Sequence, residues 1–129
     1  MIKHEYIHNG AFGFEAGGSV EGLKVVYHCS EKPWQKGDSR KVLWICHALT
    51  ANSDAQDWWP ELVGPGKLFD TEKYFVVCAN MLGSAYGSSG PSSINPASGR
   101  PYSLASMRPA SLQNQYPHCT YLPSPIARR

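Results

Sequence analysis

Two polar loops hold the residues best suited to chemistry, and each follows a continuously apolar run. Residues 47–52 (His-Ala-Leu-Thr-Ala-Asn) follow the run 42–46, and residues 80–91 follow the run 74–79. Ligands gather at the carboxyl ends of strands in open α/β sheets, where backbone N–H groups can stabilise a developing oxyanion. The first loop is therefore predicted to supply such an N–H group. We interpret His47 as a cap on the strand end rather than as a catalytic base.

The second loop is rich in glycine, with Gly83, Gly87 and Gly90 among serines. Glycine allows close backbone approach and unusual dihedral angles, so a phosphate-binding loop is one interpretation. The G-x-x-x-x-G-K-[ST] pattern and its lysine are missing, which weakens that interpretation. A flexible Ser/Gly linker is the alternative, and composition alone does not separate the two.

No G-x-S-x-G motif, the strained turn that presents a nucleophilic serine at a strand end, occurs in the sequence. Residues 83–87 have the right glycine spacing but Ala85 at the centre. Residues 17–21 have Ser19 at the centre but end in Glu21. Neither segment is predicted to carry a nucleophile.

The elements that must position these loops are mostly strands. Alternating runs predict a hairpin between residues 11–16 and 23–29. The apolar runs 41–46 and 74–79 predict buried strands, the first of them central and covered on both faces. A short helix is expected at residues 58–63. This order of elements favours an α/β protein that is mostly strand, with one or two short helices.

Composition excludes several classes of function. The chain of 129 residues is one domain at most. Its formal net charge of +2 is too small to indicate nucleic acid or an anionic membrane as partner. No run approaches the ~18 apolar residues of a membrane span, and the first residues lack a signal-peptide core. We expect no nucleic-acid partner, no membrane partner and no metal.

The chain changes character near Tyr102. Residues 103–129 contain no Asp or Glu and several prolines, and they show no strand or helix period. We predict a domain at residues 1–102 and an unrelated, irregular and disordered tail at 103–129. Cys46 and Cys78 lie in the apolar runs and are predicted to be small buried residues with reduced thiols.

Several segments together resemble the N-terminal third of homoserine O-acetyltransferase. The resemblance runs from about Gly13 to Tyr102 and is specific as a set, although each motif alone is weak. The segments that carry it are Cys46-His47-Ala48-Leu49-Thr50, Asp57-Trp58-Trp59, Gly66-Lys67-Leu68-Phe69-Asp70, Tyr74-Phe75-Val76-Val77-Cys78-Ala79-Asn80, Gly87-Ser88-Ser89-Gly90-Pro91 and Ser93-Ile94-Asn95-Pro96.

This resemblance implies the N-terminal portion of an α/β-hydrolase fold in a cytoplasmic enzyme that is commonly a homodimer. The family moves an acetyl group from acetyl-CoA to the hydroxyl of L-homoserine in methionine biosynthesis, with acetyl-CoA as a substrate and no cofactor. Close relatives use succinyl-CoA. The mechanism is ping-pong through an acyl-serine with a Ser-His-Asp triad. By resemblance, the backbone N–H of Leu49 is an oxyanion-hole donor, and Thr50, Gly87, Ser88 and Gly90 form part of the pocket wall.

The chain departs from the family after Pro101-Tyr102, where a helix, the serine elbow, the Asp and the His are expected. Residues 103–129 resemble none of these, so we predict truncation before the nucleophile. The chain by itself is then expected to be inactive. The alternative is a non-catalytic remnant, or an interaction module that pairs with a full-length acyltransferase through its open strand edges.

Overall fold

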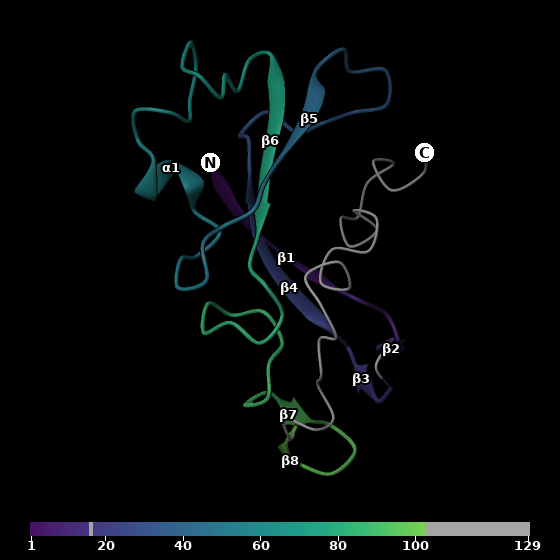
Figure 1. Ribbon diagram of the computed structural model, residues 1–129. Helices are drawn as coiled ribbons and strands as arrows, with labels where there is room; N and C mark the ends of the chain where they lie inside the picture. Colours follow the sequence, from purple (N-terminus) through teal and green to yellow (C-terminus); the bar gives the residue numbers. More distant parts are fainter. Residues whose placement is uncertain (16, 103–129) are drawn as a thin grey trace. The chain divides into compact units, whose positions relative to one another are not determined.

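The computed structural model describes residues 1–15 and 17–102, and these residues are mostly in strands and loops (Figure 1). They group into two compact units, Met1–Glu5 with Val26–Asn80, and Tyr6–Val25 with the described residues from Met81 onward. The elements in chain order are β1 (Ile2–Ile7), β2 (Ala11–Gly13), β3 (Ser19–Glu21), β4 (Lys24–Cys29), β5 (Lys41–Ile45), α1 (Ala55–Trp58), β6 (Tyr74–Ala79), β7 (Ile94–Asn95) and β8 (Arg100–Pro101).

The main sheet is mixed, with the strand order β1-β4-β6-β5. Strands β5 and β6 are parallel, with Val42 opposite Phe75, and are joined by a crossover that contains α1. Strand β4 runs antiparallel to β6, with Tyr27 opposite Ala79. A parallel pair joined through a helix, extended by an antiparallel strand, is the arrangement of an α/β sheet. The predicted α/β class, mostly strand with a short helix, is confirmed.

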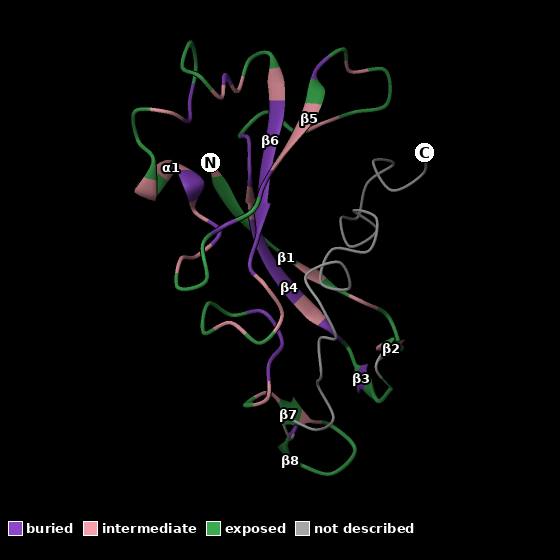
Figure 2. Ribbon diagram, in the orientation of Figure 1, coloured by how far each residue is buried: buried purple, intermediate pink, exposed green. Residues whose placement is uncertain are grey.

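The core of the first unit forms around β6, which Figure 2 shows as buried along most of its length. Val76, Val77 and Cys78 are fully buried, as their continuously apolar sequence predicts. One cluster of buried side chains joins β5, α1 and β6 and consists of Ile45, Ala55, Val63, Val76 and Cys78. Burial of these side chains is what fixes the two parallel strands, and therefore the loops that follow them.

The second unit contains two short hairpins. Strand β2 pairs antiparallel with β3, with Phe12 opposite Val20, and β7 pairs with β8. Ser89 binds Lys24 twice: its N–H donates to the Lys24 carbonyl at 2.7 Å, and its Oγ accepts the Lys24 N–H at 2.8 Å. Tyr102 is buried, and its hydroxyl accepts the Glu21 N–H at 3.2 Å.

The predicted hairpin between residues 11–16 and 23–29 is wrong. The partner of β2 is β3, because the turn at Gly17 and Gly18, both with positive φ, closes directly onto residues 19–21. Strand β4 instead lies between β1 and β6. Residues 19–21 are too short and polar to be recognised as a strand, and β1 is likewise unpredicted.

The helix begins earlier than predicted, at Ala55 rather than at residue 58. The Asp54 side chain caps it by accepting the Asp57 N–H at 3.2 Å. It ends at Trp58 because Pro60 disfavours helical backbone at Trp59, which adopts φ −130° and ψ 58°. Trp58 packs against the core cluster, whereas Trp59 is exposed.

Strand β5 also differs from its prediction. It is at an edge of the sheet in the described part of the chain, and Val42, Leu43 and Trp44 are half-buried. Cys46, predicted to be buried, is exposed, because β5 ends at Ile45 and Cys46 already belongs to the loop. Cys78 is fully buried, as predicted, and burial raises the pKa of its thiol to about 12.

This contrast predicts selective alkylation. In the native chain at pH 8, iodoacetamide is expected to modify Cys46 at least about tenfold faster than Cys29 or Cys78, because only an accessible thiolate reacts. Peptide mapping by mass spectrometry over a time course measures the three rates, and the chain unfolded in urea is the control in which they converge. Equal rates for Cys46 and Cys78 in the native chain would contradict the described burial.

Candidate functional site

The loop after β5 begins with a buried histidine. His47 is buried, and its Nδ1 lies 2.7 Å from the carbonyl oxygen of Ala48, so Nδ1 carries the proton and donates. The Ala51 N–H donates to the same carbonyl group at 2.9 Å and closes a turn around Leu49 and Thr50. His47 is therefore buried and bonded within its own loop, and its role as a cap on the strand end stays a prediction.

Leu49 is at the tip of this turn. Its side chain is 88% exposed, and its backbone N–H finds no acceptor among the described residues. Thr50 is exposed beside it. The turn directly follows the carboxyl end of β5, which is the end of a parallel strand where ligands bind in α/β sheets.

Three polar side chains lie at the base of the loop. His28 on β4 places Nδ1 2.8 Å from the Ser53 Oγ, and its Nε2 is 3.7 Å from the nearer Asp54 carboxylate oxygen. Ser53 is fully buried. Burial lowers the pKa of His28, and the Asp54 carboxylate opposes this shift more weakly. The set contains the residue types of a Ser-His-Asp triad, but a serine without solvent access cannot attack a substrate.

Further bonds fix the end of the loop to α1. The Asn52 side chain accepts the Asp54 N–H at 2.8 Å, and the Asn52 carbonyl accepts the Trp58 Nε1–H at 3.2 Å. Sequence reasoning missed His28 and Ser53 as determinants of the site, whereas Asn52 belongs to the predicted loop. Residues 28 and 53 are far apart in sequence, and no pattern signals that they meet.

The glycine-rich loop lies in the second compact unit. Gly90 is buried, and a Cβ added there would lie 3.1 Å from the Gly83 Cα, so a side chain at residue 90 would require the Gly83 backbone to shift. The Gly83 N–H donates to the Ser89 carbonyl at 2.8 Å. Gly87 is exposed with φ 95°, and Ser88 is buried. The flexible-linker interpretation is therefore wrong for residues 88–90, which are packed and hydrogen-bonded.

The five predicted site residues thus fall on two loops. Leu49 and Thr50 share the turn after β5 in the first unit, and Gly87, Ser88 and Gly90 share the second loop in the other unit. The two loops are ordered by different means: buried polar bonds hold the first, and a glycine-to-glycine approach holds the second.

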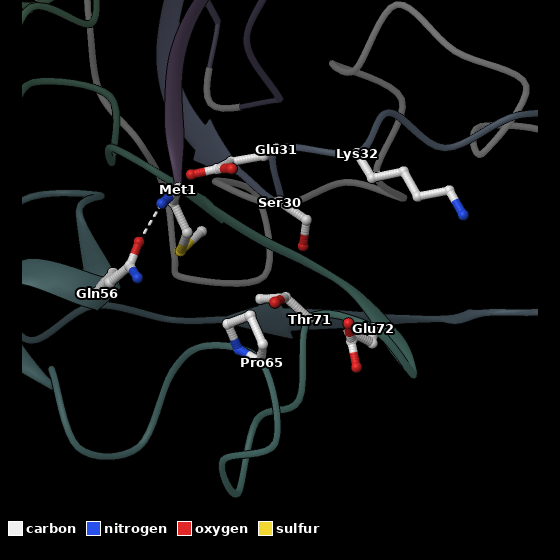
Figure 3. Close-up of a pocket in the computed structure, with 8 residues that line it drawn as sticks. All are labelled: Met1, Ser30, Glu31, Lys32, Gln56, Pro65, Thr71 and Glu72. Carbon is white, nitrogen blue, oxygen red and sulfur yellow. Dashed lines mark hydrogen bonds between the residues drawn. The ribbon is translucent and has the colours of Figure 1, made fainter.

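A pocket of about 310 Å³ lies elsewhere in the first unit (Figure 3). Ser30 follows β4, and Thr71 and Glu72 precede β6, so this part of the wall is at the amino end of β6. The loop of Leu49 follows the carboxyl end of the parallel strand β5. None of the predicted site residues is among the described residues that line this pocket, which are Met1, Ser30, Glu31, Lys32, Gln56, Pro65, Thr71 and Glu72.

In residues 1–15 and 17–102, no three His, Cys, Asp or Glu side chains gather in a way that would hold a metal ion. The same residues include no helix with the length and apolar character of a membrane-spanning segment.

No protein-family model matches the chain. It is 40% identical over 115 residues to homoserine O-acetyltransferase from Deferribacter desulfuricans, a match that covers 81% of this chain and 30% of the relative. Among solved structures, homoserine O-acetyltransferase from Bacillus anthracis is 31% identical with a TM-score of 0.65, covering 78% of this chain and 30% of that one. Esterase E22 is 27% identical to this chain with a TM-score of 0.66, and the match covers 80% of this chain and 32% of the esterase.

The chain spans less than a third of the length of these proteins. The sequence identity and the structural similarity nevertheless agree, because homoserine O-acetyltransferases are found by both comparisons over about four fifths of this chain. Where it matches, the chain is therefore a homologue of the N-terminal part of homoserine O-acetyltransferases and has the N-terminal portion of an α/β-hydrolase fold.

Proposed function

We propose that residues 1–102 are the N-terminal part of an acyltransferase that moves an acetyl group from acetyl-CoA to the hydroxyl of L-homoserine through an acyl-serine. The reaction belongs to methionine biosynthesis and to the cytoplasm. One structural observation supports this proposal in addition to the similarity to the named relatives. The Leu49 N–H follows the carboxyl end of β5 and has no acceptor among the described residues. A donor held in this way is suited to an oxyanion.

In the proposed mechanism the serine of the intact enzyme attacks the thioester carbonyl of acetyl-CoA, its proton passes to the triad histidine, and the Leu49 N–H donates to the oxyanion. Collapse of this intermediate breaks the C–S bond, and CoA leaves with the proton from the histidine. The homoserine hydroxyl then gives its proton to the histidine and attacks the acyl-serine carbonyl, and the serine leaves with that proton as the acetyl ester of homoserine is released. Thr50, Gly87, Ser88 and Gly90 contribute to the pocket wall. Acetyl-CoA is a substrate, and no cofactor takes part. The active enzyme is a homodimer with no nucleic-acid or membrane partner.

A chimera tests this function, because the 129 residues contain no G-x-S-x-G motif. Residues 1–102 replace the matching segment of the Deferribacter desulfuricans enzyme, and CoA release is measured with acetyl-CoA or succinyl-CoA, with and without L-homoserine. We expect homoserine-dependent release with acetyl-CoA from the chimera and none from the 129-residue chain alone. A folded chimera that only hydrolyses acetyl esters would contradict the transferase and favour a hydrolase.

A second candidate is an interaction module, which the position of β5 favours. This strand is at the edge of the described sheet, although its residues Val42, Leu43 and Trp44 are apolar and only half-buried. An apolar edge strand is a template for another strand. Co-purification of the 129-residue chain with the intact Deferribacter desulfuricans enzyme would support this candidate. A chain that stays separate from that enzyme in size-exclusion chromatography would remove it.

A further inference from the structure

The loop that carries Leu49 is held at its far end by a contact from a strand distant in sequence. His28 projects from β4, and its Nδ1 meets the Ser53 Oγ at 2.8 Å. Ser53 is fully buried and directly precedes the helix cap Asp54. The contact therefore joins the sheet to the point where the loop becomes α1, and Ser53 has no access to a substrate.

The surrounding charges determine which nitrogen of His28 carries the proton. The Asp54 carboxylate lies 3.7 Å from Nε2, which favours the proton on that nitrogen. Nδ1 of the neutral ring then accepts the Ser53 hydroxyl proton. The other charged groups that act on the ring are Lys3, His4 and the Met1 ammonium group. Cys78 lies opposite His28 on β6 and is a neutral thiol.

We propose that His28 is a positioning residue for acyl transfer: through Ser53 it fixes the loop that presents the Leu49 N–H. This role rests on the proposed function, because it matters for catalysis only if Leu49 is the oxyanion donor. His28 itself touches no reacting atom. Its effect is to keep the turn at residues 48–51 in one arrangement, so that the donor need not be ordered at each turnover.

This arrangement depends on the neutral ring. Protonated His28 has donors on both nitrogens, so Nδ1–H can only donate to the Ser53 Oγ, and the buried Ser53 hydroxyl proton loses its acceptor. Burial lowers the pKa of His28 below its ordinary 6.5. The stability that this group contributes is therefore complete above pH 6.5 and is lost as the pH falls through the folded-state pKa. The loop should therefore lose order over the same pH range in which His28 becomes protonated.

The test uses the 129-residue chain labelled with ¹⁵N and measures amide-exchange protection factors, which remove the intrinsic pH dependence of exchange. Two loop amides report: Ala51, bonded to the Ala48 carbonyl, and Asp54, bonded to the Asn52 side chain. Ser53→Ala and His28→Ala are expected to lower their protection by about tenfold, the factor typical of losing one hydrogen bond. Amides of β6 should keep theirs. His8→Ala, which removes a histidine that packs on Phe12, is the matched control.

Two further arms separate positioning from general stability. His28→Asn keeps a side-chain amide near the Nδ1 position and should restore protection. In the unaltered chain, protection of Ala51 and Asp54 should fall as His28 titrates, and in His28→Asn that step should vanish. If the alanine variants fail to fold, these two arms decide. Any one of three results would overturn the proposal. The first is unchanged loop protection in folded Ser53→Ala, and the second is a pH step that persists in His28→Asn. The third is an unaltered chain in which no β6 amide is protected.

The two proposals fail independently, since the exchange measurement involves no turnover. A chimera without acyl transfer would refute the function while leaving the loop result intact. Loop amides whose exchange protection does not depend on His28 would refute the positioning role while leaving the function intact.

Discussion

Replacing Leu49 by proline in the active chimera is expected to lower kcat for acyl transfer by about 10²–10³-fold, the usual cost of one oxyanion-hole donor. Proline has no backbone N–H, so the hydrogen bond that forms as the carbonyl oxygen becomes charged is lost. The KM for acetyl-CoA should change little, because this bond strengthens only in the transition state. Initial rates of CoA release over a range of acetyl-CoA concentrations give both constants.

The control is Leu49→Ala, which keeps the N–H and removes a side chain that is 88% exposed. It should lose far less activity than the proline variant, because it keeps the backbone donor that proline removes. An amide-to-ester replacement at the same position removes the N–H without the proline ring and should reproduce the loss. Equal losses in the proline and alanine variants would assign the effect to the side chain or to the fold, and no loss in either would exclude Leu49 as a donor.

Arg40→Ala is expected to destabilise the chain by about 3 kcal/mol, since several bonds to a buried guanidinium are lost together. Arg40 is buried, and its Nε binds both Asp38 carboxylate oxygens at 3.1 and 3.0 Å. Its Nη1 and Nη2 donate to the carbonyls of Lys32 and Pro33 at 3.2 and 3.0 Å. The group also lies 5.8 Å from the centre of the Phe75 ring. Arg40 therefore fixes the loop that leads into β5.

Urea unfolding measures this effect as a lower midpoint with an unchanged m-value. Arg100→Ala, at an exposed arginine on β8, is the matched control and should shift stability by less than about 0.5 kcal/mol. Arg40→Lys should be intermediate, because an ammonium keeps the charge but cannot bind two oxygens and two carbonyls at once. Equal midpoints for the Arg40 and Arg100 variants would show that the loop before β5 does not depend on Arg40.

The pairing of Arg40 with Asp38 also predicts that the stability of the chain depends on pH in the acid range. The hydrogen bonds from Arg40 lower the pKa of Asp38 to about 2. For a carboxyl group whose folded pKa is depressed, the stabilisation is complete above the ordinary pKa near 3.8 and is lost as the pH falls toward 2. The urea midpoint of the unaltered chain should therefore fall in this window. A fall of the same size in Asp38→Asn would assign it to other groups.

Much of the sheet is determined by sequence alone. The run 74–79 is apolar at nearly every position, and only a strand covered on both faces can bury it, so β6 has the predicted bounds. The same reasoning found β5. The turn at Leu49 and the glycine-rich loop were found because polar residues follow directly after these strands.

Only the tertiary structure decided which elements meet. Strand β4 pairs with β6 instead of with residues 11–16, and Cys46 is exposed while Cys78 is buried. The contact of His28 with Ser53 and the approach of Gly83 to Gly90 have no sequence signature. The physical reason is that local patterns fix how a segment can be buried, whereas its partner is selected by packing among segments far apart in the chain.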